Sequence, residues 1–227
     1  MEETSHALFS IGPLEVTGTV TTMWAIILVL TLLSWLATRN MKEVPGKLQN
    51  VAEMAVGSLQ NYFNGTLGSK LCKKYFPIFA TFFIFIIVSN YSGILPGAGH
   101  LKAFHVPTAS MSVTAGLGVV AFFTTHVIGS KEKGGFVKYL IGLLTSMTIP
   151  LFFLAVIEQF VRPFSLALRL YGNLYGEEQV TENLYKIFPI AAPLVMQVLS
   201  LLFCLIQALV FTMLLSIYVK EAAEEEE

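Results

Sequence analysis

The sequence predicts an all-α integral membrane protein with about five transmembrane helices and one interfacial amphipathic helix. Hydrophobic residues make up 55% of its 227 residues and charged residues 13%, and the mean hydropathy is +0.69. Several uncharged stretches approach the roughly 20 residues that a helix needs to cross about 30 Å of hydrocarbon. We therefore expect residues 1–227 to form a single membrane domain.

The first predicted span covers residues 20–37 and is followed by basic side chains at Arg39, Lys42 and Lys47. The amino-terminal stretch MEETSHALFS carries two glutamates instead of the basic residues of a signal peptide. We therefore expect the first span to remain in the protein.

Residues 45–65 predict an amphipathic helix that lies along the membrane interface instead of crossing it. Apolar side chains recur there at helical spacing, at Leu48, Val51, Ala52, Ala55, Leu59, Tyr62 and Phe63. Polar residues lie between them, as in helices that rest at the lipid–water boundary.

Two further spans are predicted at residues 76–95 and 111–128. A loop that contains glycine and histidine residues connects them. The two cysteines, Cys72 and Cys204, lie far apart in helical stretches, so we expect packing residues and predict neither a disulfide framework nor a metal site.

Residues 139–176 and 187–219 are each too long for one perpendicular crossing. A helix over 139–176 would be nearly twice as long as the hydrocarbon is thick, at about 1.5 Å per residue. It must tilt steeply, bend or divide, and Pro150 and Pro163 are the candidate bend points. We expect both helices to be long and tilted. The polar connection GEEQVTENLYK joins them, and a solvated acidic tail follows at residues 220–227.

The basic residues predict the orientation. With five crossings, most of them fall on one side, namely Arg39, Lys42, Lys47, Lys70, Lys73, Lys74, Lys131, Lys133, Lys138 and Lys220, and only Lys102 and Lys186 fall on the other. The basic side is expected to be cytoplasmic, which places the amino terminus outside and the carboxyl terminus inside. A six-crossing arrangement, with 139–176 split into a hairpin, is the alternative and would weaken this asymmetry.

Arg169 stands in the apolar stretch FSLALRLYGNLY. An arginine at the centre of a membrane helix costs roughly 2.5–3.5 kcal/mol on insertion scales, so such a residue is usually functional. At about 100° per residue, polar and very small residues share one face of this helix, within about 60° of a line. They are Glu158, Arg162, Ser165, Arg169, Gly172, Asn173 and Gly176. We expect this face to meet water, a partner carboxylate or a closely packed helix.

Four stretches carry a resemblance to a known family. The run IEQFVRPFSLALRLYGNLYGEE is similar to the signature of subunit a of the F-type ATP synthase, the stator subunit that faces the rotating ring of c subunits. The run IQALVFTMLLSIYV resembles the last helix of that family, and SNYSGILPG and VPTASMSVT match in the family's order. The resemblance covers nearly the whole chain from the first span onward.

The resemblance implies roles for polar residues of the last two helices. Arg169 would be the essential arginine beside the ring carboxylates, with Asn173 on the same helix and Gln207 facing it from the last helix. Glu178 would be the acidic group of the outer half-channel. Hydrogen bonds that merely join two helices are the alternative for Asn173 and Gln207, and an ordinary loop position is the alternative for the glutamate.

Two departures from the family's pattern affect the ion path. Glu177 doubles the acid, and Gly176 comes one place earlier than the family's small residue. Ser200 stands where some members carry a histidine and others a carboxylate, and a serine does not titrate near neutral pH. A relay would therefore depend on Glu177 or Glu178, on Glu158 and on water.

The residues and the resemblance together predict a stator subunit that forms two aqueous half-channels and couples the flow of protons or Na⁺ to rotation and ATP synthesis. Arg169 suits the barrier between the half-channels because its charge favours an ionised ring carboxylate, while a guanidinium does not relay protons. Glu158 and Arg162 lie one turn apart, so both a channel role and a mutual ion pair near the inner interface are open for Glu158.

The resemblance also implies partners. They are the c-subunit ring, the b subunits of the peripheral stalk, the remaining ATP synthase subunits and the lipid of the bacterial cytoplasmic (inner) membrane. No nucleic acid, cofactor or metal is expected. Because the sequence has no GxxxxGK[ST] loop, we expect no catalytic site in this chain and assign ATP chemistry to other subunits. A haem protein would need paired histidines on facing spans, and a secondary transporter would need two related halves. The sequence indicates neither feature.

Overall fold

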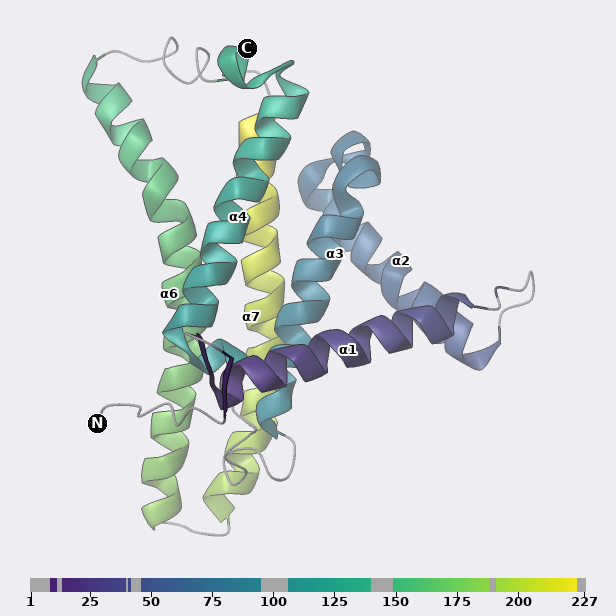
Figure 1. The fold of residues 1–227 in the computed structure, drawn as a ribbon, viewed down its shortest axis with the longest axis vertical. Helices are drawn as coiled ribbons and strands as arrows, with labels where there is room; N and C mark the ends of the chain where they lie inside the picture. The colour runs from purple at the N-terminus through teal and green to yellow at the C-terminus, as the bar shows by residue number, and fades with distance from the viewer. Residues whose placement is uncertain are drawn as a thin grey trace.

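The structure, a computed structural model, is built almost entirely of helices (Figure 1). It describes residues 9–11, 14–39, 41, 46–94, 106–139, 149–187 and 191–223. Near the amino terminus, β1 (Phe9–Ile11) and β2 (Leu14–Val16) form a short antiparallel hairpin with Phe9 opposite Val16. This hairpin was not predicted from the sequence.

Within the described residues, four helices are long and apolar enough to cross a membrane. They are α1 (Gly18–Thr38), α3 (Ser69–Tyr91), α4 (Met111–Glu132) and, from Val195 onward, α7 (Ala191–Ala223). A fifth long helix, α6 (Ile149–Ile187), packs against α4 and α7 and carries Arg169. The predicted fold class, an all-α multi-pass membrane protein, is confirmed.

The amphipathic helix is α2 (Lys47–Leu67). Its last turns are buried against the core, where the Phe63 ring lies 5.6 Å from that of Phe79 on α3. Its first half leaves apolar side chains exposed at Val51, Met54 and Val56. Gly68 then separates α2 from α3 with a φ of 77°, a conformation that a residue without a Cβ adopts at little cost.

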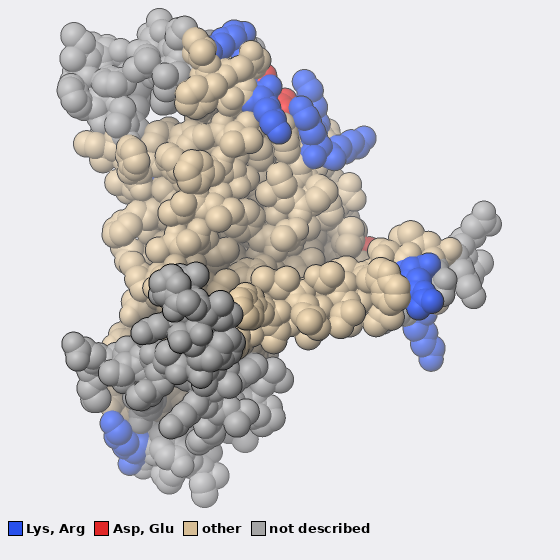
Figure 2. Space-filling model, in the orientation of Figure 1, with Lys and Arg blue, Asp and Glu red and all other residues tan. Residues whose placement is uncertain are grey.

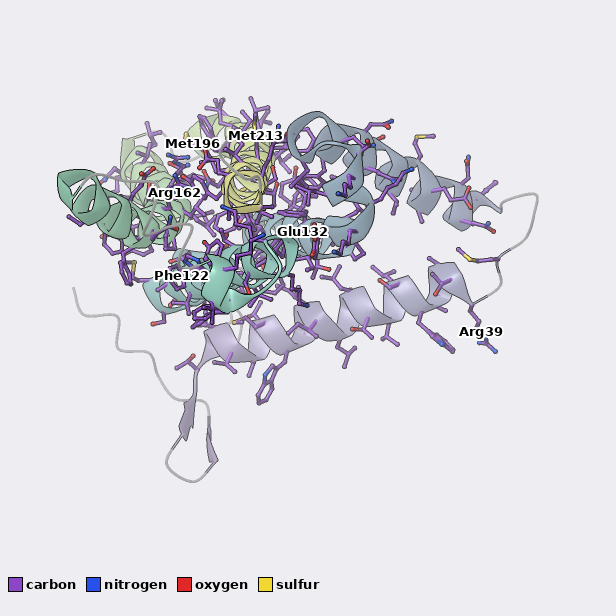
Figure 3. The ribbon with its side chains drawn as sticks, turned by 90° about the horizontal axis from the view of Figure 1, so that it is seen from above. Arg39, Phe122, Glu132, Arg162, Met196 and Met213 are labelled. Atoms are coloured by element: carbon purple, nitrogen blue, oxygen red, sulfur yellow. The ribbon has the colours of Figure 1, made fainter. Side chains whose placement is uncertain are left out.

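α1 crosses the direction of α4 and α7 at a wide angle, as Figures 1 and 3 show. At about 1.5 Å per residue its 21 residues span about 32 Å, close to the thickness of the hydrocarbon, whereas the 39 residues of α6 span about 58 Å. A bilayer that α1 crosses directly is therefore crossed by α6 and α7 at a steep tilt.

The core forms around α7, which packs against α2, α3, α4 and α6 (Figure 1). Phe211, Leu215 and Val219 of α7 are fully buried. The Phe211 ring stacks on that of Phe82 from α3, with centroids 6.1 Å apart. Thr212 is buried as well. Its hydroxyl is satisfied there, because it donates to the Ala208 carbonyl of the same helix over 2.8 Å.

The start of α3 and the ends of α4 and α7 meet at one end of the molecule. Lys74 of α3 pairs with Glu132 of α4 at 2.6 Å. Gly129 of α4 lies so close to α7 that a Cβ there would be 2.9 Å from the Ala222 carbonyl oxygen. Figure 2 shows lysine and arginine side chains gathered at this end and at the far end of α1. Residues 220–223 of the predicted acidic tail belong to α7, which continues to Ala223, and residues 224–227 lie outside the described residues.

The long arginine-bearing helix was predicted at residues 139–176, and the structure describes α6 over Ile149–Ile187. α6 continues to Ile187, so the stretch GEEQVTENLYK is helical; after Gly176 it has neither glycine nor proline and is rich in helix formers. Residues 136–139 are helical after the turn that follows α4, and the Tyr139 N–H donates to the Gly135 carbonyl over 3.0 Å. Residues 140–148 lie outside the described residues. Pro163 lies inside α6 without ending it, so no hairpin divides residues 149–187.

Candidate functional site

Arg169 lies on the outer face of α6. Its neighbours Leu166, Ala167 and Leu170 are buried, whereas Arg169 is exposed. Among the side chains that the structure describes, none forms an ion pair or a hydrogen bond with Arg169. The guanidinium is therefore accessible from outside the helical bundle.

An amide pair joins α6 to α7 one turn beyond Arg169. Asn173 Nδ2 donates to Gln207 Oε1 over 2.6 Å. Gln207 is 4% exposed, and within the described part of the chain its Nε2 group has no hydrogen-bond partner. The structure thus places Gln207 opposite the helix that carries Arg169, with an N–H group still able to bind water or a partner.

A second set of polar residues lies around Cys204, nearer the start of α7. Ser200 is 8% exposed and lies one turn before the buried Cys204 on α7. The Glu177 carboxylate of α6 is near enough to influence the Cys204 thiol electrostatically. Asn90 of α3 donates from Nδ2 to the Cys204 carbonyl oxygen over 3.5 Å. Three helices therefore bring polar groups together at this point.

Asn90 and Cys204 were not predicted as site residues. Asn90 Oδ1 and the neighbouring Ser89 Oγ are buried without a hydrogen-bond partner among the described residues. The sequence contains a signal for Ser89 and Asn90, because both residues lie in SNYSGILPG, where polar residues end an apolar span. Cys204 has no such signal, since its polar surroundings arise only when α3, α6 and α7 pack together.

Glu177 and Glu178 lie within α6 and not in a loop. The Glu177 carbonyl oxygen accepts a hydrogen bond of 2.8 Å from Thr181 Oγ1, one helical turn ahead. The Glu177 side chain is half-buried, whereas the Glu178 side chain lies outside the described residues. Adjacent residues of a helix lie about 100° apart around its axis.

Arg162 joins two carboxylates at the other end of this region. Its Nη2 atom lies 2.6 Å from Glu158 Oε1, and its Nη1 atom lies 2.6 Å from Glu221 Oε2. The ion pair expected as one alternative for Glu158 is therefore present. Glu221 was predicted to belong to a solvated tail, but it lies in the last turn of α7 and binds α6.

Acidic residues flank Arg169 along α6. Glu158 lies 11 residues before it and Glu177 eight residues after it, which corresponds to about 16 Å and about 12 Å along the helix axis. Glu158 lies towards the lysine-rich end of the molecule, and Glu177 lies towards the other end. Within the described ranges, no group of three or more histidine, cysteine or acidic side chains could hold a metal ion.

Known proteins resemble this chain over most of its length. The family model for the ATP synthase A chain matches residues 20–220. ATP synthase subunit a 3 of Pelobacter propionicus is 42% identical over 203 residues, which cover 89% of this chain and 86% of that protein. ATP synthase subunit a of Geotalea uraniireducens is 41% identical, and that of Geotalea daltonii 40%, with the same coverage. This chain therefore belongs to the ATP synthase subunit a family.

Proposed function

We propose that this chain is the stator subunit of the ATP synthase membrane sector. It forms two aqueous half-channels that carry protons or Na⁺ to and from the carboxylates of the c-subunit ring, and so couples ion flow to rotation and ATP synthesis. The observation that supports this most directly is the exposed Arg169, a fixed charge on a membrane helix without an ion-pair partner among the described side chains. A charge in this position needs a partner from outside the chain, and a ring carboxylate supplies one.

The chemistry of a guanidinium fits the barrier between the half-channels. Its positive charge favours the ionised form of a ring carboxylate that comes close, so the carboxylate releases its ion before it passes Arg169. The guanidinium keeps its own protons and therefore gives protons no direct route between the half-channels. Such a route would dissipate about 2.3 kcal/mol per charge for each 100 mV of membrane potential.

The polar group around Cys204 supports an outer half-channel. Asn90 Oδ1, Ser89 Oγ and Gln207 Nε2 are buried without partners among the described residues, whereas buried polar atoms in proteins are almost always satisfied by protein or ordered water. Water at these three atoms would connect the level of Arg169 with Glu177. Ser200 can bind such water but cannot titrate, so the titrating group of this path is Glu177 or Glu178.

Glu158 supports an inner half-channel at the lysine-rich end. It lies on α6 at nearly the same rotation as Arg169, since 11 residues are about three full turns. Its side chain is 54% exposed although it pairs with Arg162. An ion that leaves the ring on this side would therefore meet an accessible carboxylate on the same face as the barrier arginine.

The proposed partners follow from this arrangement. The c-subunit ring lies against the outer face of α6, and the b subunits of the peripheral stalk and the remaining ATP synthase subunits complete the complex. Lipid covers the exposed apolar side chains of α1. We place the protein in the bacterial cytoplasmic membrane with its amino terminus outside and its lysine-rich end inside. ATP is made on other subunits, so this chain has no catalytic site of its own.

Arg169→Ala tests the proposal. In the intact complex, reconstituted in vesicles, this variant is expected to assemble but to lose both ion-driven ATP synthesis and ATP-driven ion pumping. Arg169→Lys should fail as well, because lysine lacks the delocalised, permanently charged guanidinium. The matched control is Arg39→Ala, which removes an exposed arginine stacked on Trp35 at the end of α1 and should leave both activities intact. Normal synthesis by Arg169→Ala would refute the proposal.

A further inference from the structure

Arg162 contacts one residue of its own helix and two residues of α7. Its Nη2 and Nε atoms bond to Glu158 Oε1 at 2.6 and 3.2 Å, and its Nη1 atom lies 2.6 Å from Glu221 Oε2 on α7. Its Cζ atom lies 4.9 Å from the ring centroid of Tyr218, also on α7. The Arg162 side chain is 21% exposed, while both carboxylates are about half exposed. In Figure 3, Arg162 lies between the ends of α6 and α7.

Arg162 and Arg169 have nearly the same orientation about the axis of α6. Seven residues are about 20° short of two full turns and span about 10.5 Å along the axis. The helix is continuous between them, through Pro163. A rotation of α6 at Arg162 therefore turns the side chain of Arg169 by the same angle.

Other contacts at this level fix the distance of α6 from its neighbours better than its rotation. On the α4 side, Gly118 lies against the Pro163 carbonyl oxygen, which a Cβ on Gly118 would approach to 2.9 Å. On the same side, the Phe160 ring stacks on that of Phe122 from α4 with centroids 5.8 Å apart, whereas Ile157 and Phe164 are exposed. Apolar contacts have no preferred direction, whereas the planar fork of a guanidinium imposes one on its carboxylate partners.

We propose that Arg162 is a positioning residue. Through Glu221 and Tyr218 it fixes the rotation of α6 against α7 and so sets the direction in which the exposed Arg169 projects towards the c-subunit ring. This inference rests on the proposed function of Arg169 and adds to it the residue that orients the barrier charge. Asn173 and Gln207 form the second fixed point, 11 residues further along α6.

The test measures the rotation of α6 directly. Spin labels are attached to cysteines introduced at Leu168 of α6 and Leu202 of α7, which are both exposed, in the intact complex in vesicles. The native cysteines are buried. The distance distribution between the labels is compared for the parent and for Arg162→Ala, with Arg39→Ala as the matched control. ATP-driven ion pumping and ATP hydrolysis are measured on the same preparations.

Arg162→Ala is expected to shift or broaden the distance distribution and to lower pumping several-fold relative to hydrolysis. Arg162→Lys should recover part of both, because lysine retains the pairing with Glu221 without the fork. Exchanging the charges, as Arg162→Glu with Glu221→Arg, should restore much of the parental distance. If Arg162→Ala does not assemble, Glu221→Gln gives the same readout from the exposed end of the pair.

An unchanged distance distribution in Arg162→Ala or Glu221→Gln would overturn the inference. A shifted distribution with parental pumping would also overturn it, because the rotation would then not matter to Arg169. These outcomes are separate from the test of the proposed function, which fails only when Arg169→Ala itself pumps normally.

Discussion

Asn173 of α6 donates a hydrogen bond of 2.6 Å to Gln207 of α7, one turn from the exposed Arg169. Gln207 is 4% exposed, so water has little access to its amide oxygen. Hydrogen bonds between membrane helices are worth about 0.6 kcal/mol on average and up to about 2 kcal/mol. This bond therefore joins the two helices one turn from Arg169.

Asn173→Ala is expected to cost more stability than the bond itself contributes. It leaves Gln207 Oε1 buried without a donor, a penalty of about 1–3 kcal/mol. Gln207→Leu should be tolerated better in stability, because it removes the buried polar group. The double variant should therefore be less damaged than the sum of the single variants, as expected for side chains in contact.

The measurement is the thermal stability of the assembled complex together with its pumping rate. Asn61→Ala, which removes an exposed asparagine from α2, is the matched control and should leave both unchanged. Strictly additive losses in the double variant would show that the two amides do not stabilise each other.

The close contact between α4 and α6 predicts a different response at two nearby glycines. A Cβ on Gly118 would lie 2.9 Å from the Pro163 carbonyl oxygen, which cannot move unless α6 moves, whereas a Cβ on Gly116 meets nothing within 4 Å. We expect Gly118→Ala to destabilise the protein by about 1–3 kcal/mol through overpacking and to slow pumping, since Pro163 lies only six residues from Arg169. Gly116→Ala should be neutral or slightly stabilising. Equal melting temperatures for the two variants would contradict the contact.

Sequence patterns predict the membrane class and single out Arg169 because both are local properties. The length and composition of an apolar stretch decide whether it can cross a bilayer. A single charge within such a stretch, such as Arg169, is evident from the sequence. The helical face that contains Glu158, Arg162 and Arg169 follows from the period of the helix alone. The ion pair of Glu158 with Arg162 could also be predicted from the helical period, since the two residues lie one turn apart.

Features that depend on packing between distant segments could not be predicted. Glu221 has the composition of a solvated tail, and only the end of α7 lying beside α6 gives it Arg162 as a partner. Cys204 resembles any packing cysteine until Asn90, Ser200 and Glu177 converge on it. The acidic stretch is polar enough to predict a connection, yet α6 continues through it because glutamate and glutamine are good helix formers.

The arrangement of helix ends predicts the topology. The ion pair of Lys74 with Glu132 and the contact of Gly129 with Ala222 bring the start of α3 and the ends of α4 and α7 to one side. A cysteine placed after residue 224 should therefore react with an impermeant maleimide only from the cytoplasmic side. A cysteine at position 101, in the segment between α3 and α4, should react only from outside. Both native cysteines are buried, so background labelling should be low, and reversed labelling at either position would reject the five-span orientation.

The outer half-channel is expected to depend on the two adjacent glutamates of α6. The family resemblance points to Glu178, whereas the structure brings the Glu177 carboxylate within electrostatic reach of Cys204, beside Ser200. Glu177→Gln and Glu178→Gln should each slow ion flux. The double variant should slow it much further, because Ser200 cannot titrate in their place.

Restoring a titratable group at position 200 provides the decisive comparison. Ser200→Glu, added to the double glutamine variant, should recover part of the lost flux, because it returns a carboxylate to the buried cluster of α3, α6 and α7. Passive and ATP-driven flux are measured in reconstituted vesicles over a range of pH, with Glu53→Gln on α2 as the control for loss of an exposed carboxylate. A double variant that conducts like the parent at every pH would show that the outer path does not run through Glu177 or Glu178. Recovery by Ser200→Glu would place that path along the face of α7 that Ser200 and Gln207 share, since seven residues are nearly two turns.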